Sequence, residues 1–249
     1  MNVVVVGASS GLGRCIGVGL GQQGEQVALL ARRHERLADA AREAGSGAIA
    51  VTCDVTDEKS CQAAIDEAAQ RLGSVDGLVY APAIGPLVRL ADMPAQTWRD
   101  VFDVNVVGAS LVTAAALPHL RESRGVAAYL SSVIGSVTAP WPGLGAYGVS
   151  KAALERLIEA WRVEHPEIGF SRIVVGDTAG GVGPNATQFA DDWDTALAAE
   201  LMPIWLERGL LTGTLLDPDE LVSAVSTVLR AGAAASIASI VVTPRPAGR

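Results

Sequence analysis

The stretch that decides the fold is "NVVVVGASSGLG", residues 2–13, in which a run of valines leads directly into a glycine-rich turn. An unbroken β-branched run is typical of a strand that is covered on both faces of a parallel sheet. The turn contains Gly7, Gly11 and Gly13, and apolar residues at helical spacing follow it. Glycines at a strand-to-helix junction let bare backbone approach a pyrophosphate, which the helix N-terminus attracts. This stretch therefore predicts a dinucleotide-binding unit rather than a merely structural turn.

The rest of the chain continues the same alternation of strand and helix. Within residues 57–73, for example, apolar residues recur at the i, i+4, i+7 spacing of a helix packed on a sheet. No linker, charge block or repeat divides the sequence. We therefore expect one α/β domain over residues 1–249, with a doubly wound, seven-stranded parallel sheet in a Rossmann-type three-layer sandwich. The six further strands are predicted at residues 26–30, 48–52, 76–80, 126–130, 171–175 and 239–242.

One long segment, from about residue 178 to residue 216, has no strand pattern. It follows the carboxyl end of a predicted strand, where ligands bind in such sheets, so we expect it to be a substrate lid. Its apolar residues predict a pocket for a bulky, apolar substrate, although lid packing or a subunit contact explains them equally well.

The composition of the chain excludes several classes of binding partner and site. The net charge of −8 argues against binding to nucleic acid or to anionic lipid. Three cysteines without CxxC spacing, and histidines without ligand spacing, predict neither a disulfide framework nor a metal site. The first residues lack a basic leader, and the apolar stretch at residues 231–244 is too short to cross a bilayer. We therefore expect a soluble, cytoplasmic protein.

The second strand indicates which dinucleotide binds. An NAD site usually carries an acidic residue about 20 residues after the glycine loop, but Arg32 and Arg33 lie there instead. Two solvated arginines are one interpretation, whereas a guanidinium pairing with a 2′-phosphate is the other. We prefer NADP(H), with NAD(H) as the alternative. Asp54, after the third strand, either begins a helix or accepts a hydrogen bond from an adenine amino group, and the sequence does not separate the two.

A tyrosine and a lysine share the predicted helix that begins near residue 147. The chain has three tyrosines and two lysines, and Tyr147 and Lys151 are four residues apart. This spacing puts both side chains on one face of a helix. An ammonium about 4 Å from the phenol, at an effective dielectric near 20, would lower the pKa of Tyr147 by nearly three units. The phenol could then exchange a proton with an alcohol or a carbonyl oxygen.

Two polar residues complete the candidate site. Ser132 follows the strand at 126–130 and can donate to a substrate oxygen, with Ser131 and Ser136 as rivals. Asn105 lies within an apolar helical segment, where an amide needs an internal partner. Its role is either a structural hydrogen bond or the anchoring of a water that relays protons to Lys151.

These motifs, in this order and at about these spacings, resemble those of the short-chain dehydrogenase/reductase family over essentially the whole chain. The resemblance implies a catalytic tetrad of Asn105, Ser132, Tyr147 and Lys151, with hydride transfer at the nicotinamide and Lys151 on the nicotinamide ribose. It also implies homodimers or homotetramers built through the helices around 100–122 and 147–163. The residues expected around the dinucleotide are Gly7, Ser9, Ser10, Gly11, Leu12, Gly13, Arg32, Arg33, Asp54, Val55, Ala81, Tyr147, Lys151 and Thr178.

The sequence departs from the family pattern in three places. Residues 80–83 read "YAPA" in place of Asn-Asn-Ala-Gly, residues 177–178 read "DT" in place of Pro-Gly, and the interval from Ser132 to Tyr147 is about two residues longer than common. The expected function is an NADP(H)-dependent oxidoreductase of a secondary alcohol or ketone. The first two departures motivate the alternative, a nucleotide-binding regulatory or scaffold protein without turnover.

Overall fold

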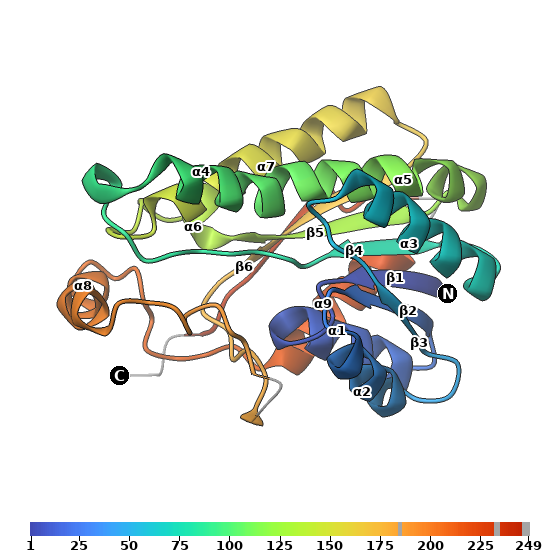
Figure 1. Cartoon of the computed structure of the whole chain (residues 1–249), viewed down its shortest axis with the longest axis horizontal. Coiled ribbons are helices and arrows are strands. Elements are labelled where there is room, and N and C mark those ends of the chain that lie inside the picture. Colours follow the sequence, from blue (N-terminus) through green and yellow to red (C-terminus); the bar gives the residue numbers. More distant parts are fainter. Residues whose placement is uncertain (184–185, 232–234, 246–249) are drawn as a thin grey trace.

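The structure is a computed structural model that describes residues 1–183, 186–231 and 235–245. Its centre is a seven-stranded sheet with the order β3-β2-β1-β4-β5-β6-β7, and every pairing is parallel (Figure 1). The predicted α/β fold and its seven strands are therefore confirmed, with ends that shift by one or two residues. The strands are β1 (Asn2–Val6), β2 (Gln26–Ala31), β3 (Ile49–Thr52), β4 (Gly77–Tyr80), β5 (Val126–Ser132), β6 (Gly169–Val175) and β7 (Ser239–Val242).

Helices cover both faces of this sheet, which makes three layers (Figure 1). The helices on one face are α1 (Gly11–Gln22), α2 (His34–Ala44) and α9 (Pro218–Arg230). The helices on the other face are α3 (Glu58–Leu72), α5 (Gly108–Ser123) and α7 (Gly145–Glu164). Asp217 caps the start of α9, since its side chain accepts a hydrogen bond from the Asp219 N–H at 2.9 Å.

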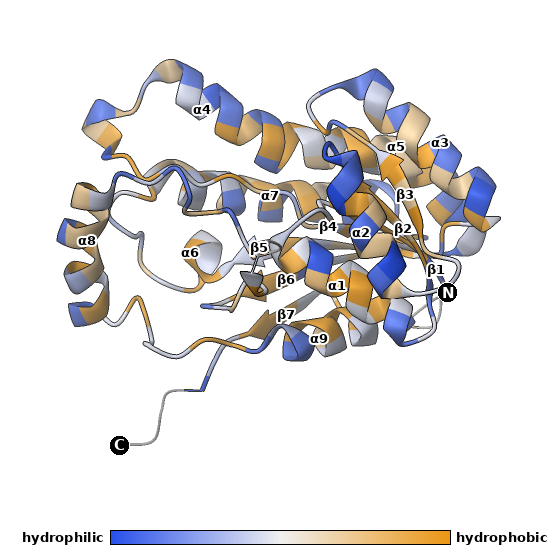
Figure 2. Cartoon of the chain, turned by 60° about the horizontal axis from the view of Figure 1, so that its bottom comes forward, coloured by the Kyte–Doolittle hydropathy of each residue, from blue (hydrophilic) through white to orange (hydrophobic). Residues whose placement is uncertain are grey.

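The valine run of β1 shows why the sheet lies between two layers of helices. Val3 and Val5 belong to the apolar core under α1 and α9, whereas Val4 and Val6 belong to the core under α3 and α5. All four are fully buried because alternate side chains of a strand point to opposite faces. In Figure 2 hydrophobic and hydrophilic residues alternate around α1 and α9, as expected for helices with one face on a sheet.

A long helix spans residues 95–123 and combines α4 (Ala95–Phe102), the π-helix η2 (Asp103–Val107) and α5. By length and composition alone it could cross a membrane, and the sequence analysis did not single it out. Buried positions make up 44% of its most apolar window, and α5 packs on the sheet and on α3. A helix in the core of a soluble protein has the same composition.

The strand order reverses between β1 and β4: β2 and β3 lie on one side of β1, and β4 to β7 lie on the other. β1 and β4 are therefore neighbours in the sheet, although β2 and β3 separate them in the chain. Ligands bind at the carboxyl ends of strands at such a point. Around that edge lie the short helices η1 (Leu90–Asp92) and α6 (Val133–Ser136), and α8 (Thr195–Glu207) lies at its far side (Figure 1).

Candidate active site

The glycine-rich turn after β1 has the backbone that its sequence predicts. Gly7 and Gly11 have φ values of +82° and +58°, a region that side chains with a Cβ rarely adopt. A Cβ on Gly13 would lie 2.4 Å from the Gly7 carbonyl oxygen. The Ser10 side chain makes no capping hydrogen bond at the start of α1. The turn thus presents the N–H groups and the positive end of a helix to the cleft.

That cleft has a volume of about 710 Å³ and runs along the carboxyl edge of the sheet. Its walls are the glycine turn, the ends of β2 to β6, one side of α7 and residues 187–193 of the segment after β6. Every residue predicted to surround the dinucleotide lines it, and so does Ser132. Asn105 does not.

Arg33 lies across the glycine turn. Its guanidinium donates to the hydroxyl oxygens of Ser9 at 2.9 Å and Ser10 at 2.8 Å, and also to the side-chain oxygen of Gln188. The arginine is therefore not simply a solvated cation. Its donors are held beside the turn that would receive the phosphates of a dinucleotide.

Asp54 lies at the end of β3 with its carboxylate in the cleft. Its Oδ1 accepts hydrogen bonds from the backbone N–H of Thr56 at 3.0 Å and from the Thr56 hydroxyl at 2.8 Å. The N–H bond is the main cause that lowers the pKa of Asp54, and the charge of Arg32 adds to it. The group is therefore an anion with an accepting oxygen available in the cleft.

The predicted Tyr147 and Lys151 pair shares one face of α7, as its spacing requires. Lys151 Nζ lies 5.7 Å from the centroid of the Tyr147 ring. The lysine side chain is only 2% exposed, and its ammonium donates to the Leu130 carbonyl oxygen at 2.7 Å. Burial lowers the pKa of Lys151 to about 8, and the nearby Glu155 carboxylate acts in the opposite direction.

The predicted lowering of the tyrosine pKa needs a correction. In this structure the pKa of Tyr147 is raised to about 12, because burial disfavours the phenolate. The Ser132 hydroxyl lowers it in part. The sequence estimate counted the charge of Lys151 but not the burial of the phenol, and burial has the larger effect.

The three candidate serines, two at the end of β5 and one in the following helix α6, have different surroundings. Ser132 faces the cleft beside Tyr147. Ser131 also lines the cleft but is 3% exposed, and its hydroxyl donates to Glu155 at 2.6 Å. Ser136 ends α6 and is not part of the cleft lining. Ser132 is thus the serine whose hydroxyl lies next to the phenol.

Asn105 is fully buried in the π-helix η2. Its Nδ2 donates to the Ile84 carbonyl oxygen and to the Ser150 hydroxyl, and its Oδ1 accepts from the Ile84 N–H, each at 2.9 Å. Ser150 in turn donates to the Tyr147 carbonyl oxygen at 2.7 Å. The amide therefore makes structural hydrogen bonds that join the chain after β4 to the first turn of α7. A contribution to proton relay stays a prediction.

Two departures from the family pattern have specific contacts. In "YAPA", the Tyr80 hydroxyl donates to the Val104 carbonyl oxygen at 2.5 Å and so ties β4 to η2. In "DT", an Asp177 carboxylate oxygen accepts from the Thr212 N–H at 3.0 Å, and Thr178 pairs with Leu216 in an isolated parallel bridge. The first departure thus joins β4 to η2, and the second holds the loop after β6 against residues 212–216.

The apolar residues of the segment at 178–216, Trp193 among them, were expected to form a pocket, but the sequence did not identify Phe189 or Gln188 as part of the cover of the cleft. The Phe189 ring packs edge-on against Tyr147, with ring centroids 5.0 Å apart, and Trp193 donates through Nε1 to the Gly85 carbonyl oxygen at 2.8 Å. Gln188 meets Arg33 at the other end of the cleft. The segment that we predicted as a lid therefore contacts both the arginine and the tyrosine. Which of its residues contact the cleft could not be predicted, because the segment has no periodic pattern.

His119, His165 and Cys61 do not line the cleft, whereas Cys53 does. His119 and His165 lie near carboxylates, at 3.6 Å from Asp66 and 3.8 Å from Glu167 respectively. Cys53 lines the cleft next to Asp54, and Cys61 is buried in α3. Among the described residues there is no cluster of three or more metal-binding side chains.

Comparison with known proteins identifies the family. The model of the short chain dehydrogenase family matches residues 1–193. The chain belongs to that family. The short-chain dehydrogenase motifs in the sequence, and the sheet on which they lie, therefore have a common origin with those of its relatives.

Relatives and solved structures agree with this assignment. The chain is 34% identical over 180 residues to 11-beta-hydroxysteroid dehydrogenase-like 3 of Arabidopsis thaliana, which covers 70% of this chain and 58% of that protein. It is 31% identical over 247 residues to glycine betaine reductase ATRR of Emericella nidulans, which covers 97% of this chain and 18% of that protein. The structure superposes on a short-chain dehydrogenase from Streptomyces avermitilis with a TM-score of 0.78 and 27% identity, over 96% of this chain and 87% of that one. The chain spans about half the length of the plant relatives it matches.

Proposed function

We propose that this short-chain dehydrogenase is an NADP(H)-dependent oxidoreductase that interconverts a ketone and a secondary alcohol. The observation that carries the proposal is the placement of Tyr147 and Lys151 on one face of α7, inside the cleft that the glycine turn opens. The names of the relatives, which include dehydrogenases and a reductase, support the same class of reaction.

The cleft fits a nicotinamide dinucleotide. A Cβ on Gly13 would collide with the turn at Gly7, so the turn keeps the close backbone approach that a pyrophosphate needs. Arg33 would hold a 2′-phosphate, Asp54 an adenine amino group and Lys151 the nicotinamide ribose. The bound cofactor would supply or accept the hydride. The donors of Arg33 beside Ser9 and Ser10 favour NADP(H) over NAD(H).

The proton chemistry follows from the groups around the phenol. With its pKa raised to about 12 by burial, Tyr147 carries its proton at neutral pH and can donate it to a carbonyl oxygen. Ser132 would hold that oxygen by a hydrogen bond. Lys151 would stabilise the phenolate that remains, because an ammonium beside a buried anion offsets its desolvation. These roles suit ketone reduction at neutral pH.

The substrate would lie under the predicted lid, over residues 178–216. Phe189, Trp193, Ile84 and Pro86 line that part of the cleft, so we propose an apolar ketone. A cytoplasmic location and assembly as a homodimer or homotetramer stay predictions from the sequence.

The test is a screen of purified protein with NADPH and NADH against a panel of ketones, aldehydes and secondary alcohols, with cofactor binding measured separately by calorimetry. We expect NADPH oxidation with at least one apolar ketone and tighter binding of NADPH than of NADH. Binding without turnover across the panel would instead support the nucleotide-binding scaffold protein. Failure to bind either dinucleotide would refute both.

A further inference from the structure

A buried carboxylate lies one helical turn beyond Lys151. Glu155 on α7 is only 4% exposed, which is unusual for a glutamate unless its charge has partners. Its Oε1 accepts from the Ser131 hydroxyl at 2.6 Å, and its Oε2 accepts from Arg172 Nη1 at 2.8 Å. Both carboxylate oxygens are therefore held from the sheet.

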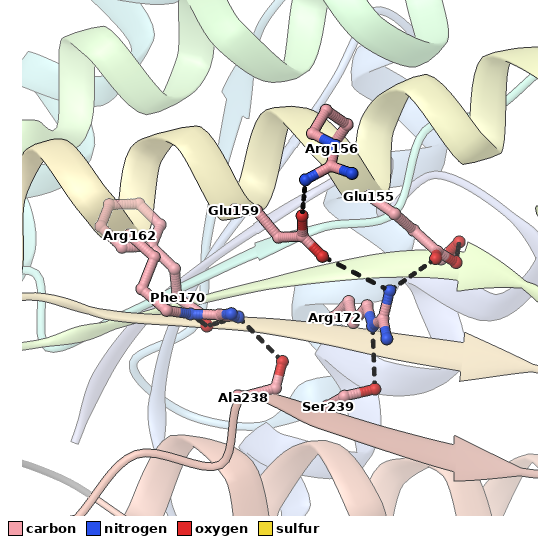
Figure 3. A network of polar contacts seen from close by, with 9 residues as sticks. Glu155, Arg156, Glu159, Arg162, Phe170, Arg172, Ala238 and Ser239 are labelled. Atoms are coloured by element: carbon pink, nitrogen blue, oxygen red, sulfur yellow. Dashed lines mark hydrogen bonds and ion pairs between the residues drawn. The ribbon is translucent and has the colours of Figure 1, made fainter. Parts of the chain in front are cut away.

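The arginine that pairs with Glu155 is itself fixed from several sides (Figure 3). Arg172 projects from β6, and its Nε donates to the Ser239 hydroxyl of β7 at 3.0 Å. Glu159, one turn further along α7, approaches the same guanidinium at 4.0 Å and also pairs with Arg156 at 2.6 Å. Glu155 is thus the buried end of a network that otherwise lies at the partly exposed edge of α7 and the sheet.

The contacts of Glu155 continue those of the catalytic pair. Tyr147, Lys151 and Glu155 recur every four residues and so share one face of α7. This face lies on the end of β5, residues 130–132. Lys151 bonds to the carbonyl of the first of these residues, Glu155 to the hydroxyl of the second, and the third lies beside Tyr147. A change at Glu155 therefore acts on the same strand end that holds the lysine.

The Glu155 carboxylate also affects the pKa of Lys151. Burial lowers the pKa of the lysine to about 8, and Glu155 raises it. Arg172 opposes Glu155 because it partly neutralises the carboxylate. Among the described residues, the titratable or charged groups in the contacts around this region are Tyr147, Glu155, Arg172 and Glu159, the last of which approaches Arg172. The neighbouring ends of β5 and η2 contribute the neutral side chains Ser131, Ser132 and Asn105.

We propose that Glu155 is a positioning residue of the active site, whose buried carboxylate, held by Ser131 and Arg172, keeps Lys151 protonated and directed at the end of β5. The proposal rests on the function proposed above for Tyr147 and Lys151. It differs from a purely structural role, in which Glu155 would clamp α7 to β6 without affecting the charge of the lysine.

The composition of the chain allows a direct test. Lys59 and Lys151 are its two lysines, and Lys59 is exposed on α3. Protein labelled with ¹³C at the lysine Cε therefore gives two resonances, which Lys59→Arg assigns, and each can be followed by NMR as the pH is raised. We expect Lys151 to titrate near pH 8, well below the ordinary range of a lysine. In Glu155→Gln its midpoint should fall by a further shift of about one pH unit, the size expected for a partly compensated charge one helical turn away.

Two variants separate charge from structure. Arg172→Met leaves the carboxylate uncompensated, so the Lys151 midpoint should move in the opposite direction, upward by about half a pH unit or more. Glu159→Gln is the matched control, because it removes a carboxylate that lies on the same helix and approaches the same arginine but has no contact with β5. It should leave the Lys151 midpoint nearly unchanged. A clamp without an electrostatic role would not give opposite signs. An unmoved Lys151 resonance in folded Glu155→Gln, or shifts of one sign in Glu155→Gln and Arg172→Met, would overturn the proposal.

The readout does not depend on turnover. If the Lys151 midpoint moves as expected but the wild-type protein reduces no carbonyl compound, the function proposed above fails while the positioning role stands. If the wild type is active, the alkaline limb of its kcat profile should shift with the NMR midpoint in Glu155→Gln, with little change in KM for NADPH. Loss of activity without that pH shift would assign Glu155 to structure alone.

Discussion

Replacing Arg33 by methionine should weaken the binding of NADPH but not of NADH. The guanidinium already donates to Ser9, Ser10 and Gln188 in the free protein. A hydrogen bond to a charged group contributes about 1.5–3 kcal/mol, and releasing a neutral partner such as Gln188 costs about 0.5–1.5 kcal/mol. The net loss for a 2′-phosphate is therefore about 1–2 kcal/mol, or about a 5- to 30-fold rise in the dissociation constant of NADPH.

The assay is isothermal titration of both dinucleotides at one fixed salt concentration, since exposed charge interactions are screened by salt. Arg42→Met is the matched control, because Arg42 is an exposed arginine at the other end of α2, where it pairs with Asp39. NADH should bind both variants as it binds the wild type. Equal weakening of NADPH and NADH in Arg33→Met, or the same weakening of NADPH in Arg42→Met, would refute the assignment of Arg33 to the phosphate.

Three other predictions concern the cover, the turn and the lysine. Phe189→Ala should uncover Tyr147 and lower its pKa from about 12 towards 10, seen as an earlier onset of tyrosinate absorbance in a pH titration; an unchanged onset would mean that Phe189 does not cover the phenol. Gly13→Ala should raise the dissociation constants of both dinucleotides about 10-fold or more, because its Cβ would lie 2.4 Å from the Gly7 oxygen, and calorimetry showing wild-type affinity would contradict the tight turn. The pKa of Lys151 is about 8 in the folded chain and 10.5 in the unfolded chain, so the buried ammonium destabilises the fold at low pH and this penalty disappears as the pH rises from 8 to 10.5. In urea unfolding, the free energy of unfolding of the wild type should rise by about 2 kcal/mol relative to that of Lys151→Met between pH 7 and pH 9.5. Parallel pH profiles of the two proteins would exclude a buried ammonium.

The fold was predictable because its signals are local. The valine run of β1 has no polar residue to expose, so it specifies a strand covered on both faces, and the other strands repeat the pattern. Gly7 and Gly11 adopt backbone angles that favour glycine, so their positions mark the turn. The spacing of Tyr147 and Lys151 survives in the structure because a helix fixes which residues share a face.

What the sequence could not provide depends on contacts between distant segments. Glu155 looks like an ordinary charged residue of an amphipathic helix until β6 brings Arg172 to it. Phe189 is more than 40 residues from Tyr147 in the chain, and no periodicity connects them. The direction of the Tyr147 pKa was wrong for the same reason, because burial is a property of the packed cleft and cannot be obtained from the spacing of two residues. The family resemblance named Asn105, but not its bonds to Ile84 and Ser150.

The central claim is that the phenol of Tyr147 transfers the proton within the dinucleotide cleft, and a comparison among the tyrosines of this chain tests it most directly. Tyr129 is a buried tyrosine that bonds to Thr113 in the core, away from the cleft lining. With a ketone that the wild type reduces, Tyr147→Phe should lower kcat about 100-fold or more while its NADPH dissociation constant stays within about threefold of the wild-type value, and Tyr129→Phe should retain turnover. Undiminished turnover in folded Tyr147→Phe would contradict the account.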